Sequence, residues 1–298
     1  MSARRCSACG AAVQVPEGKR GMTCSFCDSA LVDDVAQEVA PVDRVVPFSV
    51  PRERAAALLK AFLAGQWLAP ESVRRAADPS ALDDVLVPFW VYDAVARTSF
   101  TARVGIHWYR TETYTVTVNG KTETRTRQVQ ETEWFPLEGS HVRQWFDHLV
   151  SASRGLAEAE ANALEPYDLG ASLPYAPALV SGVSAEQPTI ERDAAANVAR
   201  LELAELERKV IASSHLPGDR SADLRTHTSS ELEPPRLVLL PVWIAAVQTE
   251  QGTLRLLVNG QTGEVVGQVP QSWWKIGGVA AGVLLVVLSA VLCFGVLR

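Results

Sequence analysis

The sequence predicts an α+β fold, and three observations lead to this prediction. Two C-x2-C motifs lie within residues 6–27, β-type apolar segments recur from residue 84 to residue 267, and the chain ends in a long apolar run. Together they predict an N-terminal zinc ribbon, an antiparallel-sheet α+β body with a protruding β-hairpin, and a single C-terminal transmembrane helix. The predicted domains are a ribbon at 1–34, a linker at 35–46, a body at 47–270 and a tail anchor at 273–298.

The N-terminal motifs predict a metal site. Cys6-Ser-Ala-Cys9 and Cys24-Ser-Phe-Cys27 are separated by 14 residues, which leaves room for a hairpin that brings the two pairs together. Four thiolates around one ion form a closed tetrahedral site, and closed zinc sites are structural. Gly10 and Asp28 follow the pairs, where a residue that tolerates positive φ is needed.

Other uses of the four cysteines are iron ligation as in rubredoxin, disulfides, and a thioredoxin-like redox motif. Disulfides are rare in cytosolic domains, and a redox C-x-x-C belongs with a βαβ pattern that the sequence lacks. Structural zinc is therefore the predicted cofactor. Chelation is expected to unfold residues 6–31 and to leave the rest of the chain folded, because so short a module has little apolar core of its own.

The charge balance argues against nucleic acid as a partner. The chain has a net charge of −6 and a pI near 5.5. Residues 1–40 carry basic side chains at Arg4, Arg5, Lys19 and Arg20 against a similar number of acidic ones, so the ribbon lacks the positive field that holds a polyanion against salt.

Three segments of the body have helical character. Apolar residues at i, i+3, i+4 and i+7 predict amphipathic helices over 51–66 and 191–212, with Ala195, Val198, Ala199 or Leu201, Leu206 and Val210 facing inward in the second. The segment 140–165, which contains His141 and His148, also looks helical. Two histidines on one face do not make a metal site without further ligands.

A β-hairpin is predicted around Asn119-Gly120. This dipeptide is the strongest signal for a two-residue turn, because both central residues need positive φ. If Val118 pairs with Lys121, threonines oppose one another on one face, whereas Glu112 faces Arg127 on the other. Neither face is apolar enough for full burial, so we expect a protruding, solvated ribbon, with partner docking as its functional interpretation.

The last part of the body is again β-type. Leu240-Pro-Val-Trp243 resembles Val87-Pro-Phe-Trp90, and each lies in an apolar strand that follows a helix and precedes a hairpin. This predicts a weak internal duplication of segments 47–150 and 190–270. Gln251-Gly252 and Asn259-Gly260 are further turn signals.

The apolar run Ile276 to Leu297 predicts the membrane anchor. Its 22 residues would span roughly 33 Å, against about 30 Å of hydrocarbon. Trp273, Trp274 and Lys275 precede it as expected for interface residues. Because the N-terminus does not look like a signal peptide, the predicted location is a single-pass protein of the bacterial cell membrane with its soluble part in the cytoplasm. The small residues Gly278 and Gly282 suggest a homodimer contact.

No motif predicts an enzyme. The sequence has no G-x-S-x-G, H-E-x-x-H, P-loop or nucleotide-binding glycine fingerprint, and its five histidines show no ordered spacing. The predicted function is a non-enzymatic adaptor or scaffold that recruits a protein partner to the cytosolic membrane face. The alternative is a membrane-tethered nucleic-acid-binding protein that uses the ribbon.

Several local signatures resemble one known family. They are the cysteine pairs, Val46-Pro-Phe48, Trp67-Leu-Ala-Pro70, Val87-Pro-Phe-Trp90, Leu164-Glu-Pro-Tyr-Asp168, Leu240-Pro-Val-Trp243 and Asn259-Gly-Gln-Thr-Gly-Glu-Val-Val-Gly267. The family consists of bacterial membrane proteins with a zinc ribbon of the transcription-factor-IIB type, some labelled primosomal helicase-like. The helicase label is not supported, because the sequence has no phosphate-binding loop motif. The resemblance implies an association with membrane-stress scaffolds of the flotillin-like or phage-shock type.

Overall fold

The computed structural model describes residues 2–15, 23–29, 31–33, 40–70, 73, 82–118, 121–249 and 252–296. The predicted turn at Asn119-Gly120, residues 35–39 of the predicted linker, Lys19, Arg20 and Gln251 lie outside these residues. The chain divides into two compact units. Unit 1 contains residues 1–91, 149–195 and 236–298, and unit 2 contains residues 92–148 and 196–235.

Unit 1 is built on a mixed sheet with the order β12-β11-β10-β5-β8-β2-β1-β3. Strand β5 pairs in parallel with β8, and β4 pairs in parallel with β10, whereas the other strand pairs of this unit are antiparallel. The prediction of an antiparallel sheet is therefore wrong. The parallel pairs involve the short strands β4 and β8, which are joined to their partners by long connections. The alternation of residues along a strand does not reveal whether its partner runs parallel or antiparallel. The strands are β1 (Ser2–Cys6), β2 (Ala12–Val15), β3 (Leu31–Asp33), β4 (Arg44–Val45), β5 (Leu82–Val118), β7 (Leu173–Pro174), β8 (Ser184–Gln187), β10 (Arg236–Thr249), β11 (Gly252–Asn259) and β12 (Val265–Gly267).

The two similar apolar segments are neighbours in this sheet. Strands β5 and β10 pair antiparallel, with Val87 opposite Leu240. The tryptophan of each segment donates its indole N–H to a backbone carbonyl: Trp90 to Ile190 and Trp243 to Val50, both at 2.9 Å. The two tryptophans thus make the same kind of hydrogen bond, and the internal duplication stays a prediction.

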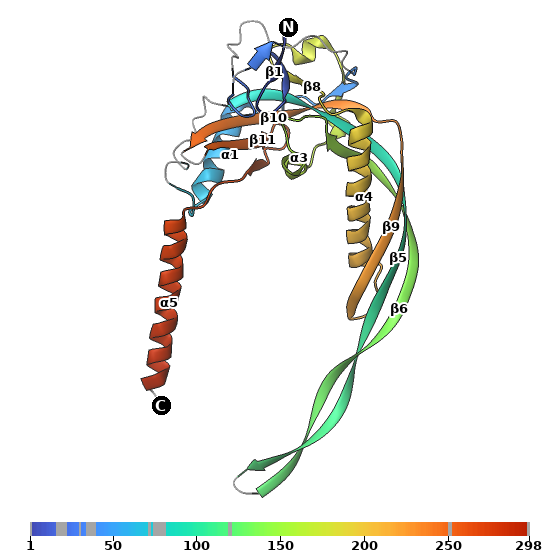
Figure 1. Cartoon of the computed structure of the whole chain (residues 1–298), viewed down its shortest axis with the longest axis vertical. Helices are drawn as coiled ribbons and strands as arrows, with labels where there is room; N and C mark the ends of the chain where they lie inside the picture. Colours follow the sequence, from blue (N-terminus) through green and yellow to red (C-terminus); the bar gives the residue numbers. More distant parts are fainter. Residues whose placement is uncertain are drawn as a thin grey trace. The chain divides into compact units, whose positions relative to one another are not determined.

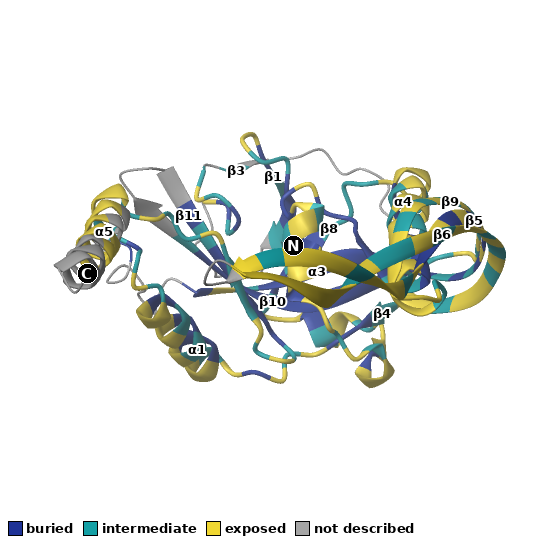
Figure 2. Cartoon of the chain, turned by 90° about the horizontal axis from the view of Figure 1, so that it is seen from below, coloured by how far each residue is buried: buried dark blue, intermediate teal, exposed yellow. Residues whose placement is uncertain are grey.

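Helix α1 (Arg52–Gly65) confirms the prediction for 51–66. Its buried residues Ala55, Leu59 and Leu63 pack in one cluster with residues of β10 and β11 such as Trp243 and Leu256. Figure 2 shows the buried side of α1 in dark blue and its opposite side in yellow. Two 3-10 turns, η2 (Leu169–Ala171) and η3 (Pro177–Val180), and the short helix α3 (Glu158–Leu164) complete the connections of unit 1.

Unit 2 contains the long hairpin of β5 and β6 (Lys121–Ser151), strand β9 (Arg220–Leu232) and most of helix α4 (Arg192–Ser214). Strand β9 pairs antiparallel with β5 from Ala94↔Leu232 to Gly105↔Arg220 (Figure 1). The hairpin continues beyond this point, and its residues are exposed on both faces, as predicted.

Two helix predictions in this part of the chain had different outcomes. Helix α4 confirms the helix predicted for 191–212. Of its predicted inward residues, Ala195 and Ala199 are buried, whereas Val198, Leu206 and Val210 are half-buried and Leu201 is 74% exposed. The helix predicted within 140–165 is wrong for its first half, because β6 runs to Ser151 and carries His141 and His148. Cross-strand pairing with β5 extends the hairpin through a segment whose own pattern was ambiguous.

Helix α5 (Trp273–Val296) follows β12. In the part of the chain that the structure describes, no helix is both long enough and apolar enough to cross a membrane. This finding contradicts the transmembrane helix predicted over 276–297, and with it the tail anchor and the single-pass location in a bacterial cell membrane.

Candidate metal centre

The four predicted ligands come together at one point in unit 1. Cys6 ends β1, Cys9 follows in the next turn, and Cys24 and Cys27 lie in a second turn of the same form. Their sulfur atoms all lie within 4.8 Å of one another. They are the only such group of metal-ligand side chains among the described residues.

The two turns repeat the same backbone hydrogen bonds. Cys6 N–H donates to the carbonyl of Ala11, and Cys24 N–H donates to that of Ser29, both at 2.8 Å. At the other end of each turn, Gly10 N–H donates to Cys6 and Asp28 N–H donates to Cys24. Each motif is thus a compact knuckle that directs two sulfurs toward the same point.

Gly10 and Asp28 have the positive φ values that the sequence predicts. The angles are +79° at Gly10 and +59° at Asp28. A chain that turns back so that amide groups face the sulfurs needs a left-handed residue here, which glycine adopts without strain and aspartate tolerates better than most residues. The departure from glycine at Asp28 therefore leaves the knuckle intact.

The sulfur spacing fits a tetrahedral cation and excludes disulfides. Cys6 Sγ lies 3.4 Å from Cys27 Sγ, and Cys9 Sγ lies 3.6 Å from Cys24 Sγ. A disulfide needs about 2.05 Å. Four thiolates at about 2.3 Å from one zinc ion would be separated by about 3.8 Å. The four cysteines can therefore hold a metal ion after a small expansion of the cage.

The thiols influence one another before any cation binds. The contact with Cys24 lowers the pKa of Cys9 to about 5, and the same contact raises the pKa of Cys24. Burial raises the pKa of Cys6. Binding of a divalent ion would release the remaining thiol protons, so metal affinity should fall steeply in acid.

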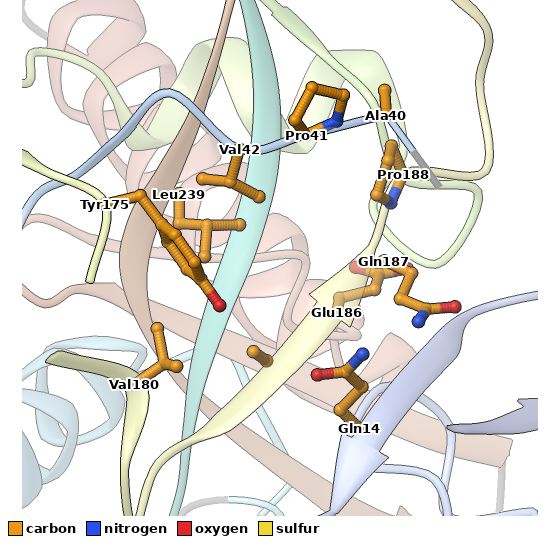
Figure 3. Close-up of a pocket in the computed structure, with 11 residues that line it drawn as sticks. Gln14, Ala40, Pro41, Val42, Tyr175, Val180, Glu186, Gln187, Pro188 and Leu239 are labelled. Carbon is orange, nitrogen blue, oxygen red and sulfur yellow. The ribbon is translucent and has the colours of Figure 1, made fainter. Parts of the chain in front are cut away.

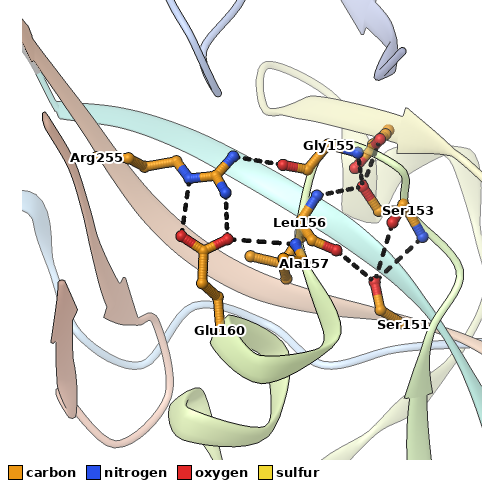
Figure 4. A network of polar contacts seen from close by, with 8 residues as sticks. Ser151, Ser153, Gly155, Leu156, Ala157, Glu160 and Arg255 are labelled. Carbon is orange, nitrogen blue, oxygen red and sulfur yellow. Dashed lines mark hydrogen bonds and ion pairs between the residues drawn. The ribbon is translucent and has the colours of Figure 1, made fainter. Parts of the chain in front are cut away.

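A loop of residues 151–157 packs against the two cysteine knuckles. Ser153 Oγ accepts hydrogen bonds from the N–H groups of Gly155 and Leu156 at 2.9 and 3.1 Å (Figure 4). A Cβ atom on Gly155 would lie 2.7 Å from Ala11 Cβ and 3.1 Å from the ring of Phe26. Only glycine lets this loop approach the knuckles so closely.

An ion pair holds the same loop from the side of β11. The Arg255 guanidinium pairs with both carboxylate oxygens of Glu160 and donates to the carbonyl of Gly155 (Figure 4). Glu160 also accepts from Ala157 N–H at 3.2 Å, at the start of α3. This network was not predicted, because its members are spread over 100 residues and match no motif.

Strand β8 completes the surroundings of the ribbon. It pairs antiparallel with β2 and in parallel with β5, so the ribbon strands continue the sheet of unit 1. Glu186 on β8 is buried and accepts from Ser153 Oγ at 2.7 Å, and among the described residues its Oε2 has no hydrogen-bond partner. Burial raises the pKa of Glu186 to about 8.

A hollow of about 230 Å³ lies over β8 (Figure 3). Its wall combines the hydroxyl of Tyr175 and the amides of Gln14 and Gln187 with apolar residues such as Val42 and Leu239. It is smaller than the 300–1,000 Å³ that is typical of ligand pockets.

The other residues singled out in the sequence lie away from the centre. Trp273 and Trp274 are exposed, and Lys275 Nζ donates to the carbonyls of Trp67 and Ala69 at 2.9 and 2.6 Å. Thus Lys275 fixes the start of α5 to the turn after α1. Gly278 and Gly282 have open space around them.

Two histidines of β6, His141 and His148, contact carboxylates of α4. His148 Nε2 lies 3.0 Å from Glu202, and His141 Nε2 lies 3.7 Å from Glu207. Glu207 is completely buried and accepts from Trp145 Nε1 at 2.8 Å and from Thr98 Oγ1 at 3.2 Å. Sequence reasoning missed Glu207, although its four-residue spacing from Leu203 and Ile211 places it in the buried stripe.

Comparison with known proteins gives little further identification. The chain is 25% identical to the uncharacterized protein YdjG of Bacillus subtilis (strain 168) over 277 residues, which cover 89% of this chain and 75% of the relative. No family model matches the chain, and no solved structure matches it. The similar protein is itself uncharacterized, so the likeness assigns no activity.

Proposed function

We propose that the chain is a non-enzymatic adaptor whose ribbon is folded around structural zinc and whose body recruits a protein partner. The observation that carries this proposal is the closed ligand set: four cysteines surround the metal position, with Cys6 and Cys24 buried, so no coordination site is open to substrate. Zinc is favoured over iron because closed four-cysteine sites with this spacing most often hold zinc.

The ribbon's connection to the sheet supports a stabilising role for the metal. Phe26 and Ala11, from the two sides of the knuckles, belong to the same core cluster as Phe89 and Leu156 of the body. A metal that fixes these residues fixes one end of the sheet. A catalytic metal would instead need an open coordination position.

A protein rather than a nucleic acid is the favoured partner. Arg4 and Arg5 lie in β1, are half-buried, and have interactions within the chain. Side chains engaged in this way are poorly placed to neutralise phosphates. Arg110, Arg125 and Arg127 of the exposed hairpin of unit 2 are likewise paired with glutamates of the same hairpin, so these arginines offer no free positive surface to a polyanion.

The test of metal identity is direct. The purified full chain should contain one equivalent of zinc by elemental analysis, and it should lack the visible absorption of an iron–thiolate centre. Zinc should be lost in Cys24→Ser. A colourless chain without stoichiometric metal, or a stoichiometric iron content, would reject the structural zinc.

The test of the adaptor role uses tagged full chains purified from the source cells. The wild type should recover a reproducible protein partner, and a variant in which residues 107–132 are replaced by a short turn should lose that partner while it keeps its zinc. A failure of the wild type to recover any reproducible partner, in repeated purifications with crosslinking, would argue against the proposal.

A further inference from the structure

The end of the unit 2 hairpin forms a two-stranded arm. Pairing of β9 with β5 ends at Gly105↔Arg220, so among the described strands β5 has only β6 as its neighbour beyond this point. We define the arm as residues 106–117 of β5 and 122–133 of β6. Figure 1 shows it as a long twisted ribbon that continues past β9 and α4.

Side-chain contacts along the arm establish which residues share a face. Arg127 contacts Glu112 at 2.8 Å, and His107 Nδ1 lies 3.0 Å from Thr132 Oγ1. Both contacts fit the register in which Val118 would face Lys121. Because side chains alternate between the faces of a strand, this register assigns every arm residue to one of two faces.

One face contains all the charged Arg and Glu side chains of the arm. Its ion pairs join Arg110 to Glu131 at 2.9 Å, Arg127 to Glu112 at 2.8 Å, and Arg125 to Glu123 at 3.1 Å. These groups satisfy one another within a single chain and are at least one-third exposed. The same face also carries the partly exposed apolar residues Ile106, Trp108 and Tyr114. Removing its ion pairs from water would still carry a desolvation penalty, which disfavours burial of this face against a second copy.

The opposite face, called the threonine face below, has no Asp, Glu, Lys or Arg among the described arm residues. The threonines between residues 111 and 126 are exposed. The face consists of His107, Tyr109, Thr111, Thr113, Thr115, Thr117, Thr122, Thr124, Thr126, Gln128, Gln130 and Thr132.

The chemistry of the threonine face fits a second copy of itself. Each threonine presents a methyl group and a hydroxyl group that both donates and accepts, so two such faces can interdigitate methyl groups and exchange hydrogen bonds without repulsion between like charges. A two-fold axis makes such a contact self-complementary. We propose that the threonine faces of two chains stack against each other and form a homodimer.

The size of the face sets the strength that we expect. Twelve residues of strand extend about 40 Å, and two strands are about 10 Å wide, so each copy would bury on the order of 400 Å² or somewhat more. The total of roughly 800 Å² lies below the about 1,200–2,000 Å² of stable specific interfaces and in the range of weak, transient contacts. The dimer should therefore be weak and depend on protein concentration. This inference does not depend on the adaptor role, because it concerns the purified chain without a partner.

Site-specific crosslinking tests the contact. Thr111→Cys, Thr115→Cys and Thr124→Cys in the full chain should give a crosslinked dimer with a short bismaleimide, in a yield that rises with concentration. Val116→Cys and Val129→Cys on the charged face are matched controls and should not exceed the wild type, which reports the background from the native cysteines. Equal yields from both faces, or none from any threonine position, would overturn the proposal.

A second experiment measures the association itself. Sedimentation velocity should show a concentration-dependent dimer for the wild type. The double substitution Thr113→Lys/Thr124→Lys should raise the dissociation constant of the dimer at least tenfold. The control Val116→Lys/Val129→Lys should leave this constant within threefold of the wild-type value. Because all four positions lie on the solvated arm, the variants should keep the zinc content and the midpoint of thermal unfolding of the wild type. A wild type that is monomeric at all concentrations, or a dimer that is insensitive to the threonine substitutions, would show that something else occupies this face or that another surface dimerises.

Discussion

The side-chain amide of Asn259 donates a hydrogen bond of 2.8 Å to the carbonyl oxygen of Leu164 at the end of α3. It also donates to Pro166, and its Oδ1 accepts from the N–H groups of Gln261 and Thr262. Two of the signatures recognised in the sequence, at 164–168 and 259–267, are therefore parts of one structural clasp.

Replacing Asn259 should destabilise unit 1. The residue is completely buried, so Asn259→Ala leaves two carbonyl and two N–H groups without partners, and we expect a loss of about 2–4 kcal/mol. Urea denaturation measures the change. Gln261→Ala, which removes the more exposed clasp to Asp168, is the matched control and should lose about 1 kcal/mol or less. Equal losses would contradict this account.

Removal of the metal should destabilise more than the ribbon. The sequence alone predicts that chelation unfolds residues 6–31 and spares the rest. However, β2 pairs with β8, and Phe26 packs in the core beside Phe89. Chelation or Cys24→Ser should therefore also increase amide exchange in β8 and in the 82–91 part of β5. Unchanged amide exchange in both strands would show that the ribbon folds independently of the body.

Backbone conformation at Asp28 should limit what this position accepts. Its φ of +59° strains a β-branched residue, so Asp28→Val should destabilise the ribbon by about 1–2 kcal/mol. Asp28→Gly should stay within about 0.5 kcal/mol of the wild type, because glycine adopts this φ freely but gains entropy in the unfolded chain. Zinc-release midpoints in a competing chelator provide the measurement, and the prediction fails if both variants release zinc alike.

Glu186 should make stability depend on pH. Burial raises its folded-state pKa to about 8, above its usual value of 4.5, so the folded chain binds this proton more tightly than the unfolded chain. Its contribution is fully present below about pH 4.5 and is lost as the pH rises to about 8 and beyond. Denaturation of Glu186→Gln should show a flatter profile than the wild type between about pH 5 and 8. Parallel profiles would show that another group is responsible.

The buried carboxylate of Glu207 should make Trp145 important for unit 2. Trp145→Phe keeps most of the apolar contact but removes the N–H donor to Glu207, and we expect a loss of about 1–3 kcal/mol. Arg143→Ala, which removes only a cation–π contact with the same ring, should lose about 1 kcal/mol or less. Thermal unfolding followed by near-ultraviolet circular dichroism compares the two variants.

Local rules predicted the parts that short-range chemistry controls. The ligand cysteines, the positive φ at Gly10 and Asp28, helices α1 and α4, and the pairing of Glu112 with Arg127 all follow from spacing, turn chemistry or periodicity. The apolar run at the C-terminus led to a transmembrane prediction that the described residues do not support. That prediction rested on the length and hydropathy of the segment and on Trp273, Trp274 and Lys275 before it.

The sequence by itself determined the metal ligands, because two C-x2-C knuckles specify their own backbone turns and need only to be brought together. Tertiary structure alone decided that β2 joins β8, that Gly155 lies beneath the knuckles, and that Glu207 is buried opposite His141. These contacts join residues far apart in the chain. Their free energy depends on burial and on partners supplied by other elements, which no local pattern encodes.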